Sequence, residues 1–396
     1  MTKRRPLRIA HLADTHLGYR AYHRIDPETG RNQRALDIER AYAAVIDDIL
    51  QREVDLVVHG GDVFHHTRPS WSAMSWFVRQ TRRLENAKLP TLVIAGNHDT
   101  PRLRTSGSAF GLLELALPDV RFVAGYEMME PRFPELELMV TAVPHGALTN
   151  PNPPIPDPQP DVWNILVTHG FVPGVVKHRR EPGEEELSSL LLDVNFDYIA
   201  LGHYHLWGAA DRNAYYSGST ERTGWGDLYA TPGYVIVTLT DDAELDVEHI
   251  PLPARPMEML APISGEGRSA RELADLALQQ AARLGKPDAM VRVRLDDTPR
   301  SIRREVEHIF RREGHEVVWS LEVRPPREET FTPLDERSQE DMLPSLRTMF
   351  DEFVAEQLAP RHDHSFVSAF RERGGRALDE AIRADQEMAT TEDATA

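Results

Sequence analysis

Eight side chains of the kind that bind metal ions follow short apolar runs at five places along this chain. They supply carboxylate and amide oxygens and imidazole nitrogens but no thiolate, because the chain has no cysteine. Such donors suit manganese, iron, zinc, magnesium or cobalt in a hydrolytic site. Asp62, which follows a Gly-Gly turn, is the candidate for a carboxylate that bridges two ions about 3.5–4 Å apart, a spacing suited to displacement at phosphorus. The eight residues are Asp14, His16, Asp62, Asn97, His98, His169, His203 and His205.

The five apolar runs indicate buried strands of an α/β sheet. Each is rich in leucine or β-branched residues and stops at Gly, Asp, Asn or His. Because ligands gather at the carboxyl ends of strands in such sheets, we expect residues that are remote in sequence to meet in one crevice. A single histidine at a strand end is more often structural, but five such ends together favour a site. The runs span residues 7–16, 55–62, 89–99, 164–170 and 197–205.

In order along the chain, the motifs D-x-H, G-D, G-N-H-D, H-G and G-H-x-H resemble those of the calcineurin-like metallophosphoesterase superfamily. The resemblance covers roughly residues 7–250 and implies a fold in which helices sandwich the sheets. Within it, GDVFHHTRPS (61–70) and AGNHDTPR (95–102) resemble the SbcD-type nucleases of DNA double-strand-break repair. Protein phosphatases of the superfamily usually place Asp-Arg-Gly shortly after the bridging aspartate, and this chain does not.

The resemblance implies a role for each residue of the pattern. The first ion is expected on Asp14, His16, Asp62 and His205. The second ion is expected on Asp62, Asn97, His169 and His203. His98 then remains free to face the scissile phosphate, with Asp99 orienting its ring, and His65 matches a second active-site histidine of the nuclease branch.

Simpler interpretations stay open beside these roles. Asp14 and His16 could form only a strand-end turn, although the other four strand ends argue against it. His65 could equally pack beneath the metals or bond to the backbone. Three further histidines, His11, His59 and His145, have no partner in the pattern, so we interpret them as core residues or as supports behind the ligands.

Composition fits a cytoplasmic enzyme with two or three structural units, because 396 residues exceed what one core usually serves. No apolar run near the N-terminus or elsewhere reaches the length of a signal or a transmembrane segment. The net charge of −18 is unusual for a DNA-binding protein. The acidity is uneven: residues 1–100 hold 15 Lys/Arg against 12 Asp/Glu (+3), and residues 328–396 hold 7 Arg against 17 Asp/Glu (−10).

One basic segment follows the first ligand pair and is a candidate for contact with DNA. Residues 18–34 interleave arginines with Tyr19, Tyr22 and His23, a mixture suited to phosphate contacts and stacking. A solvated loop without a ligand is an equally weighted interpretation. The candidate DNA-binding residues are Arg20, Arg24, Arg31 and Arg34, with Arg68 in the nuclease-like motif.

The pattern of elements predicts three parts: a metallophosphoesterase domain (1–252), a small α+β capping domain (253–326) and a tail (327–396). In the second part, helices are expected over 270–285 and 299–314 and strands over 289–296 and 316–325. The resemblance implies that this domain lies over the active site. The tail contains a polar linker and two amphipathic segments, with Phe350 in the first and Phe370 in the second. They either dock on the chain's own domain or, as the resemblance implies, on an SbcC-type SMC-like ATPase.

We therefore expect a nuclease that depends on two divalent cations, with Mn preferred over Mg, Fe, Zn and Co, and that acts with the ATPase in DNA repair. The resemblance implies 3′-5′ exonuclease activity on duplex DNA, endonuclease activity on single strands or hairpins, and a homodimer formed through helices around 35–50 and 70–85. The alternative is another phosphoesterase of this scaffold, acting on cyclic nucleotides or phosphoproteins. The ligand set alone does not decide between them or identify the metal.

Overall fold

The structure is a computed structural model of the chain, and it describes residues 4–101, 103, 106–150, 156–172, 185–192, 194–241, 245–324, 354 and 366–376. The chain divides into two compact units, Met1–Pro325 and Pro326–Ala396. The sheets and the candidate site belong to the first unit.

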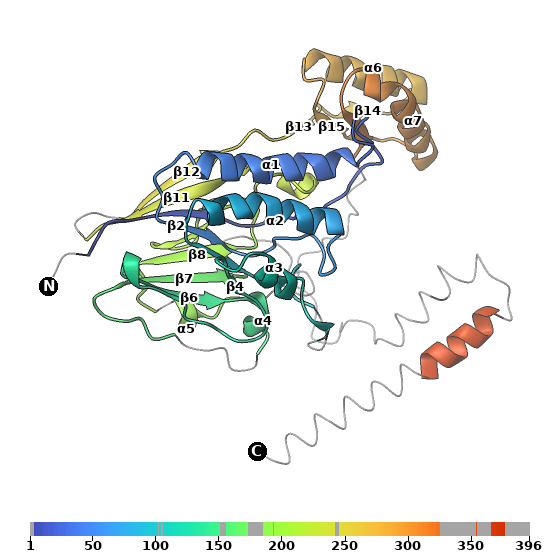
Figure 1. Ribbon diagram of the computed structural model, residues 1–396. Helices are drawn as coiled ribbons and strands as arrows, with labels where there is room; N and C mark the ends of the chain where they lie inside the picture. Colours follow the sequence, from blue (N-terminus) through green and yellow to red (C-terminus); the bar gives the residue numbers. More distant parts are fainter. Residues whose placement is uncertain are drawn as a thin grey trace, which may run out of the picture. The chain divides into compact units, whose positions relative to one another are not determined.

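Two six-stranded sheets form the body of the first unit (Figure 1). In each, four neighbouring strands run parallel; antiparallel strands lie on one side of them in the first sheet and on both sides in the second. The first sheet has the order β12 (Asp246–Pro251), β11 (Gly233–Leu239), β1 (Leu7–Leu12), β2 (Leu56–His59), β3 (Thr91–Ile94) and β4 (Arg121–Val123). The second has the order β5 (Arg132–Phe133), β6 (Leu138–Val143), β7 (Trp163–His169), β8 (Tyr198–Gly202), β10 (Ala214–Tyr216) and β9 (Gly208–Ala209).

Alternation along the strands explains why the two sheets pack face to face. Ile9 and Val58 of the first sheet join Val140 and Ile165 of the second in one buried cluster. The residues between them, such as Val57, face the helices on the other side of the first sheet. Both faces of each central strand are therefore apolar, as in the runs of the sequence. The prediction of an α/β fold with helices outside two sheets is confirmed.

Helices α1 (Gln33–Ile49) and α2 (Trp71–Asn86) lie side by side over the first sheet (Figure 1), followed by α3 (Phe110–Ala116). The side chains of Asn32 and Ser70 cap α1 and α2 by accepting the backbone N–H groups of Ala35 and Ala73. Helices α4 (His145–Leu148) and α5 (Ser189–Leu192) pack against the second sheet through Ala147 and Leu191. The 3₁₀ turns η2 (Pro134–Leu136) and η3 (Trp225–Asp227) lie in the connections before β6 and after β10.

Residues 257–323, called the cap segment below, contribute a cluster of their own. It contains β13 (Met257–Met259), β14 (Ile263–Ser264), α6 (Ala270–Arg283), β15 (Met290–Val293), β16 (Leu295–Asp296), α7 (Arg300–Glu313), η4 (Gly314–Glu316) and β17 (Ser320–Val323). Leu273, Val291 and Phe310 are among its buried residues. The predicted helices and strands are present, and they form an α+β unit. The boundary at residue 252 stays a prediction, because residues 1–325 form one compact unit.

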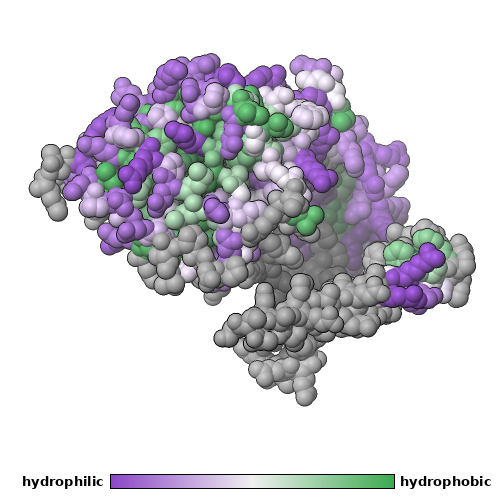
Figure 2. Space-filling view, turned by 60° about the horizontal axis from the view of Figure 1, so that its bottom comes forward, coloured by the Kyte–Doolittle hydropathy of each residue, from purple (hydrophilic) through white to green (hydrophobic). Residues whose placement is uncertain are grey.

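In the second unit, the structure describes a helix over residues 366–376. Phe366 and Phe370 lie one turn apart on it, with exposed fractions of 46% and 39% and ring centroids 6.1 Å apart. Figure 2 shows separate hydrophobic and hydrophilic patches on the visible side of this helix. The predicted amphipathic segment around Phe350 and the linker lie outside the described residues. Among the described helices, none is both long and apolar enough to cross a membrane.

Candidate active site

The ends of β1, β2, β3, β7 and β8 bring the seven predicted metal ligands together at one edge of the two sheets. Four of these residues have positive φ angles: Asp14 (53°), His16 (45°), Asp62 (54°) and His203 (113°). Few residues other than glycine adopt this region, and such conformations cluster at functional sites where the surroundings hold them. Four of the seven ligands thus adopt a backbone conformation that is uncommon outside glycine.

Asp14, His16 and His205 form one half of the crevice. Their ligand atoms lie within 4.8 Å of one another, and Nε2 of His16 lies 3.1 Å from Nε2 of His205. The other ring nitrogen of His205, Nδ1, lies 2.9 Å from both carboxylate oxygens of Asp227. Because Nδ1–H donates to Asp227, Nε2 is the atom of His205 that can bind a metal. This half contains the ligands predicted for the first ion other than the shared aspartate.

Asn97, His169 and His203 form the other half. Nε2 of His169 lies 2.9 Å from Oδ1 of Asn97, and Nδ1 of His203 lies 3.3 Å from the same oxygen. Nδ1 of His169 donates to the carbonyl oxygen of Gly60 at 2.8 Å, which again leaves Nε2 for a ligand. The predicted second site therefore has a matching geometry.

Asp62 lies between the halves. Its Oδ1 is 3.5 Å from Nε2 of His169, and its Oδ2 is 3.7 Å from Nε2 of His16. A carboxylate in this position can contribute one oxygen to each of two ions. The donors are oxygen and nitrogen atoms that converge without a thiolate, so the residues fit a pair of divalent cations.

Opposite charges set the protonation of the buried ligands. Burial opposes the ionised form of Asp62, but His169 and His16 hold the pKa of its carboxyl well below the usual value. Burial also disfavours the charged form of His169, but Asp62 and Asp14 outweigh this effect and raise its pKa to about 9. Asp227 outweighs burial in the same way and raises the pKa of His205 to about 9. Without a bound cation, both imidazoles are protonated at neutral pH.

Two glycines allow the strand ends to approach this closely. Gly61 has a φ of 98°, and a Cβ there would lie 2.6 Å from Nδ1 of His169. A Cβ on Gly96 would collide with the carboxylate of Asp62. The Gly-Gly-Asp and Gly-Asn-His motifs therefore need glycine at these two positions, because the backbone itself lies against the ligand side chains.

His98 lies at the edge of the crevice with 37% of its side chain exposed. Its Nε2 is 4.0 Å from Oδ2 of Asp62, and its Nδ1 donates to the main-chain carbonyl of His65 at 2.8 Å. The His65 ring stacks on the His98 ring with centroids 5.2 Å apart. Burial and the adjacent His98 lower the pKa of His65 to about 4, so its imidazole is neutral at pH 7. His65 supports His98, and its predicted direct catalytic role stays a prediction.

Asp99 does not orient His98, contrary to the sequence-based prediction. Its buried carboxylate instead accepts the backbone N–H groups of Val63 at 3.0 Å, Phe64 at 2.9 Å and Gly96 at 3.0 Å. Asp99 therefore joins the turn after β2, which carries the bridging aspartate, to the turn after β3. The main-chain carbonyl of His65, and not Asp99, accepts the hydrogen bond from Nδ1 of His98.

Among the candidate DNA-binding residues, Arg34 is corrected by the structure. It is 1% exposed, and its guanidinium pairs with Asp37 at 2.7 Å and Glu221 at 3.3 Å. Because the fold closes over this side chain, it is a structural residue of α1 and is not available to DNA. Arg31 is partly exposed but pairs with Glu39, including one hydrogen bond of 2.8 Å.

The other three arginines stay available in different degrees. Arg20 and Arg68 are exposed, and their contact with DNA stays a prediction. Arg24 is half-buried and donates to the carbonyl oxygen of Trp319 in the cap segment.

His11 and His59 are buried: Nδ1 of His11 lies 2.8 Å from the hydroxyl of Tyr198, and Nε2 of His59 lies 3.1 Å from the hydroxyl of Thr15. These two contacts place both histidines behind the site, as the simpler interpretation expected.

Sequence reasoning missed Asp227. Its carboxylate is buried, orients His205, and also accepts the N–H of Thr223 at 2.7 Å and the hydroxyl of Thr223 at 2.9 Å. Burial raises the pKa of Asp227, but His205 and these hydrogen bonds hold it at about 2. An aspartate in a Gly-Trp-Gly-Asp turn after the last ligand has no distinctive sequence signal.

A sheet sandwich with a histidine- and aspartate-lined crevice at its strand ends defines a metal-dependent phosphoesterase. The sequence model of the calcineurin-like phosphoesterase family matches residues 7–206, and the chain belongs to this family. The match covers the predicted ligands, including His205 as the last, and excludes Asp227 and the cap segment.

Curated relatives extend the similarity to DNA repair proteins. The chain is 32% identical over 262 residues to the DNA double-strand break repair protein Mre11 of Haloferax volcanii, covering 63% of this chain and 53% of the relative. It is 32% identical over 249 residues to the Mre11 protein of Halobacterium salinarum, covering 61% and 58%. The chain spans about half the length of these relatives. A purple acid phosphatase structure from yellow lupin seeds has 13% identity and a TM-score of 0.36, covering 63% of this chain and 52% of that one.

Proposed function

We propose that this chain is a two-metal-dependent DNA phosphodiesterase, the nuclease subunit of an SbcCD-like repair complex. We assign it 3′-5′ exonuclease activity on double-stranded DNA and endonuclease activity on single strands and hairpins. The observation that carries the proposal is the convergence of six ligands around the seventh, Asp62, with the exposed edge of His98 beside them. The Mre11 relatives support DNA as the substrate.

When bound, two divalent cations, which we propose to be manganese, supply the Lewis acidity that activates water and neutralises charge on the phosphate. The chain's own residues orient the substrate phosphate and transfer the proton to the leaving oxygen. His98 presents Nε2 toward the crevice, while its Nδ1–H is held by the carbonyl of His65. Because that carbonyl accepts the Nδ1–H group, Nε2 is the ring atom of His98 that is left to exchange a proton with the leaving oxygen.

A cationic helix in the cap segment favours a long polyanion over a small phosphodiester. Helix α7 contains five arginines and three glutamates, although the whole chain is strongly acidic. Its apolar side packs on the cap core through Val306 and Phe310. Within the described part of the chain, none of the five arginines forms an ion pair with a carboxylate. Unpaired arginines along one helix are suited to successive phosphates of a nucleic acid. They are Arg300, Arg303, Arg304, Arg311 and Arg312.

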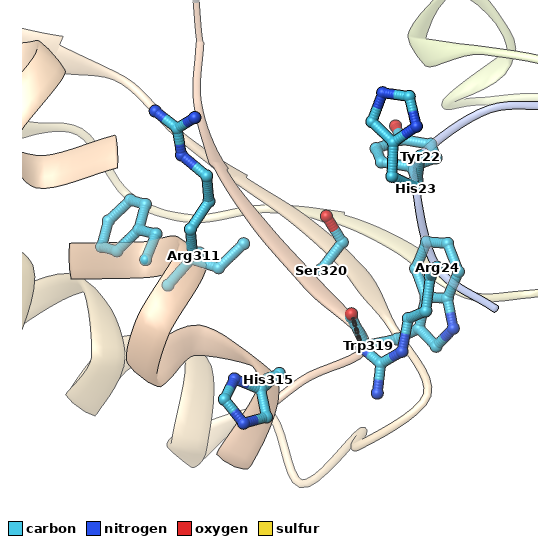
Figure 3. A pocket seen from close by; sticks show the side chains of 9 residues that line it. Tyr22, His23, Arg24, Arg311, His315, Trp319 and Ser320 are labelled. Atoms are coloured by element: carbon cyan, nitrogen blue, oxygen red, sulfur yellow. Dashed lines mark hydrogen bonds between the residues drawn. The ribbon is translucent and has the colours of Figure 1, made fainter. Parts of the chain in front are cut away.

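A groove of about 390 Å³ continues this surface toward the loop that follows the first ligand pair. Figure 3 shows Arg311 on one side of the groove, Arg24 on the other and Ser320 between them. His23 and His315 also line it. The position of Arg24 in a basic groove thus supports its predicted contact with DNA. Its guanidinium also donates a hydrogen bond to the carbonyl oxygen of Trp319 in the cap segment.

The decisive experiment compares two substrates with the same purified chain in Mn²⁺: end-labelled duplex DNA and a chromogenic phosphodiester. We expect both to be hydrolysed by the native chain. Replacing Arg300, Arg304 and Arg311 together by alanine should reduce DNA hydrolysis at least tenfold at 0.1 M salt and leave hydrolysis of the small ester within twofold. The variant should also flatten the dependence of DNA binding on salt, because fewer counterions are released.

A matched control places three alanines at exposed arginines of the cap region outside α7, Arg268, Arg283 and Arg294, and should leave DNA hydrolysis unchanged. Hydrolysis of the small ester without cleavage of any DNA would favour the alternative function, a phosphoesterase for cyclic nucleotides or phosphoproteins. Absence of both activities, or fewer than two bound Mn²⁺ ions per chain, would reject the two-metal proposal. The Asp62→Asn variant should lose one or both ions, because a carboxamide lacks the charge that offsets two cations.

We further propose that the chain works in the cytoplasm as a homodimer bound to an SbcC-type SMC-like ATPase. The exposed Phe366 and Phe370 support an apolar contact with the ATPase, in the manner of a helix in a groove. For the dimer, the candidates stay α1 and α2; Trp71, at the start of α2, is 77% exposed.

A further inference from the structure

The segment from Glu221 to Leu228 connects the metal crevice to the cap segment. It follows β10 and includes the 3₁₀ turn η3. Asp227, at the end of this turn, contacts the ligand His205, and Trp225, at its start, contacts the cap segment. Only one residue separates them, so both contacts are made by the same turn of chain.

The contact with His205 is made by a carboxylate that is itself fixed. Both oxygens of Asp227 lie 2.9 Å from Nδ1 of His205, and Oδ2 also accepts the N–H of Thr223 at 2.7 Å and of Gly224 at 3.3 Å. A carboxylate held by the backbone can define both the tautomer and the ring orientation of its histidine. The result is that Nε2 of His205 faces Nε2 of His16.

The other end of the segment is anchored by buried charges. The carboxylate of Glu221 pairs with Arg34 at 3.3 Å and accepts the N–H of Arg255 at 3.1 Å. Arg34 also donates to the carbonyl of Arg222 at 2.5 Å. Arg255, in the connection between β12 and β13, pairs with Asp37 of α1 at 2.7 Å. The segment is therefore held where the chain passes from the sheets to the cap segment.

Trp225 provides the contact with the cap segment itself. It packs in a cluster with Met257, Met290 and Trp319, and the guanidinium carbon of Arg292 lies 4.4 Å from the centroid of its ring. Its Nε1–H donates to the hydroxyl of Tyr22 at 3.0 Å. Tyr22 and Trp319 also line the basic groove of Figure 3. One turn of chain thus touches the groove wall, the cap segment and a metal ligand.

We propose that Asp227 is a positioning residue that holds His205 for the first metal ion, and that the cap segment, through Trp225, keeps Asp227 in place. The affinity of the ion site of Asp14, His16 and His205 then depends on the docking of the cap segment. The inference rests on the metal pair of the proposed function but not on the identity of the substrate. The second site, at Asn97, His169 and His203, has no contact with this turn among the described residues and serves as an internal reference.

The test is a titration of the metal-free full-length chain with Mn²⁺, in which both sites are resolved by calorimetry and by the electron paramagnetic resonance of free Mn²⁺. In Asp227→Ala, we expect one of the two sites to weaken about 10- to 100-fold and the other to stay within threefold. Asp227→Asn, which keeps the shape and one acceptor oxygen, should have a smaller effect on the same site. Trp225→Ala should weaken this site by up to about tenfold, and Trp225→Phe should restore most of the affinity.

Two controls separate positioning from loss of structure. The surface variant Asp246→Asn should leave both sites unchanged. Thermal unfolding in EDTA should stay cooperative in Asp227→Asn, so this variant remains informative if the alanine variant does not fold. Equal weakening of both sites would overturn the proposal, and so would two unchanged sites in folded Asp227→Asn and Asp227→Ala. If Asp227 variants weaken one site and Trp225→Ala leaves it unchanged, the coupling to the cap segment is wrong. A chain that binds both ions as expected but cleaves no DNA would contradict only the proposed function.

Discussion

The ring of His98 is oriented by the main chain of His65, whose carbonyl oxygen accepts a hydrogen bond from Nδ1 at 2.8 Å. The two rings also stack at 5.2 Å. His98 is therefore held by the turn that follows Asp62 rather than by a carboxylate. Its Nε2 stays 4.0 Å from Oδ2 of Asp62, and potential ligand atoms of His98, His65 and His16 lie within 4.8 Å of one another.

This geometry predicts that His98→Leu keeps both metal ions but loses most DNA hydrolysis. General acid catalysis is typically worth a factor of about 10²–10⁴, so kcat should fall within this range. Metal content by mass spectrometry and single-turnover cleavage of labelled DNA measure the two effects separately. Loss of an ion in this variant would make His98 a ligand, and normal turnover would leave it a structural role.

Asp99 gives a prediction about stability. Asp99→Ala removes the acceptor of three buried N–H groups, those of Val63, Phe64 and Gly96. We expect the free energy of unfolding to fall by about 2–4 kcal/mol, because each unsatisfied buried donor is costly. Urea unfolding in EDTA at pH 8 measures it, with the exposed Asp246→Ala as a control expected to change little. Unchanged stability with lost activity would return Asp99 to the role of a partner of His98.

The position of the site was predictable from sequence because its ligands follow the ends of recognisable buried strands. Buried parallel strands are apolar on both faces, so a run such as residues 164–170 identifies itself, and its last residue, His169, must lie at the sheet edge. The two-sheet arrangement came from family resemblance, because apolar runs alone do not tell which strands pair. The register between β1 and β11, which are more than 200 residues apart, has no local signal.

The errors concern polar residues whose partners come from distant parts of the chain. Arg34 lies in a basic segment of the sequence, which suggested a surface residue, but it forms a buried ion pair with Glu221. The family resemblance implied that Asp99 orients His98, but its carboxylate accepts the backbone N–H groups of Val63, Phe64 and Gly96 instead. Asp227 was missed for the same reason, because its partner His205 lies 22 residues before it. Spacing identifies ligands on strand ends but not the groups that hold them.

The buried imidazoles predict a release of protons when metal binds. The pKa values of His169 and His205 are raised above the ordinary 6.5 to about 9, despite burial, by Asp62 and Asp227 respectively. Both rings are therefore protonated at pH 7.5 in the metal-free chain, and both must lose a proton to bind an ion. Filling the two sites should release about two protons, and the affinity should rise as the pH rises toward 9.

Calorimetric titration with Mn²⁺ at pH 7.5 in two buffers of different ionisation enthalpy measures this release. The difference between the apparent enthalpies divided by the difference between the buffer enthalpies gives the number of protons. A heat that does not depend on the buffer would show that the ligands are already neutral, and the raised pKa values would then be wrong. The Asp227→Ala variant should release about one proton fewer, because the pKa of His205 falls without its partner.

The last prediction concerns the second unit. Truncation after Pro325 should leave the first unit folded and able to bind two ions, because the seven proposed ligands and Asp227 all lie within Met1–Pro325. The same truncation should abolish binding to the SMC-like ATPase if the tail is the docking element.

Within the tail, Phe370→Ala should weaken the complex about thirtyfold, since an aromatic anchor in a desolvated pocket contributes about 2 kcal/mol or more. The exposed and charged Glu372→Ala is a matched control on the same helix. Surface plasmon resonance with the immobilised ATPase measures the affinities, and metal content confirms that each variant is intact. An unchanged affinity of the truncated chain would place the ATPase site on the first unit, whereas loss of metal on truncation would show that the tail belongs to the folded nuclease.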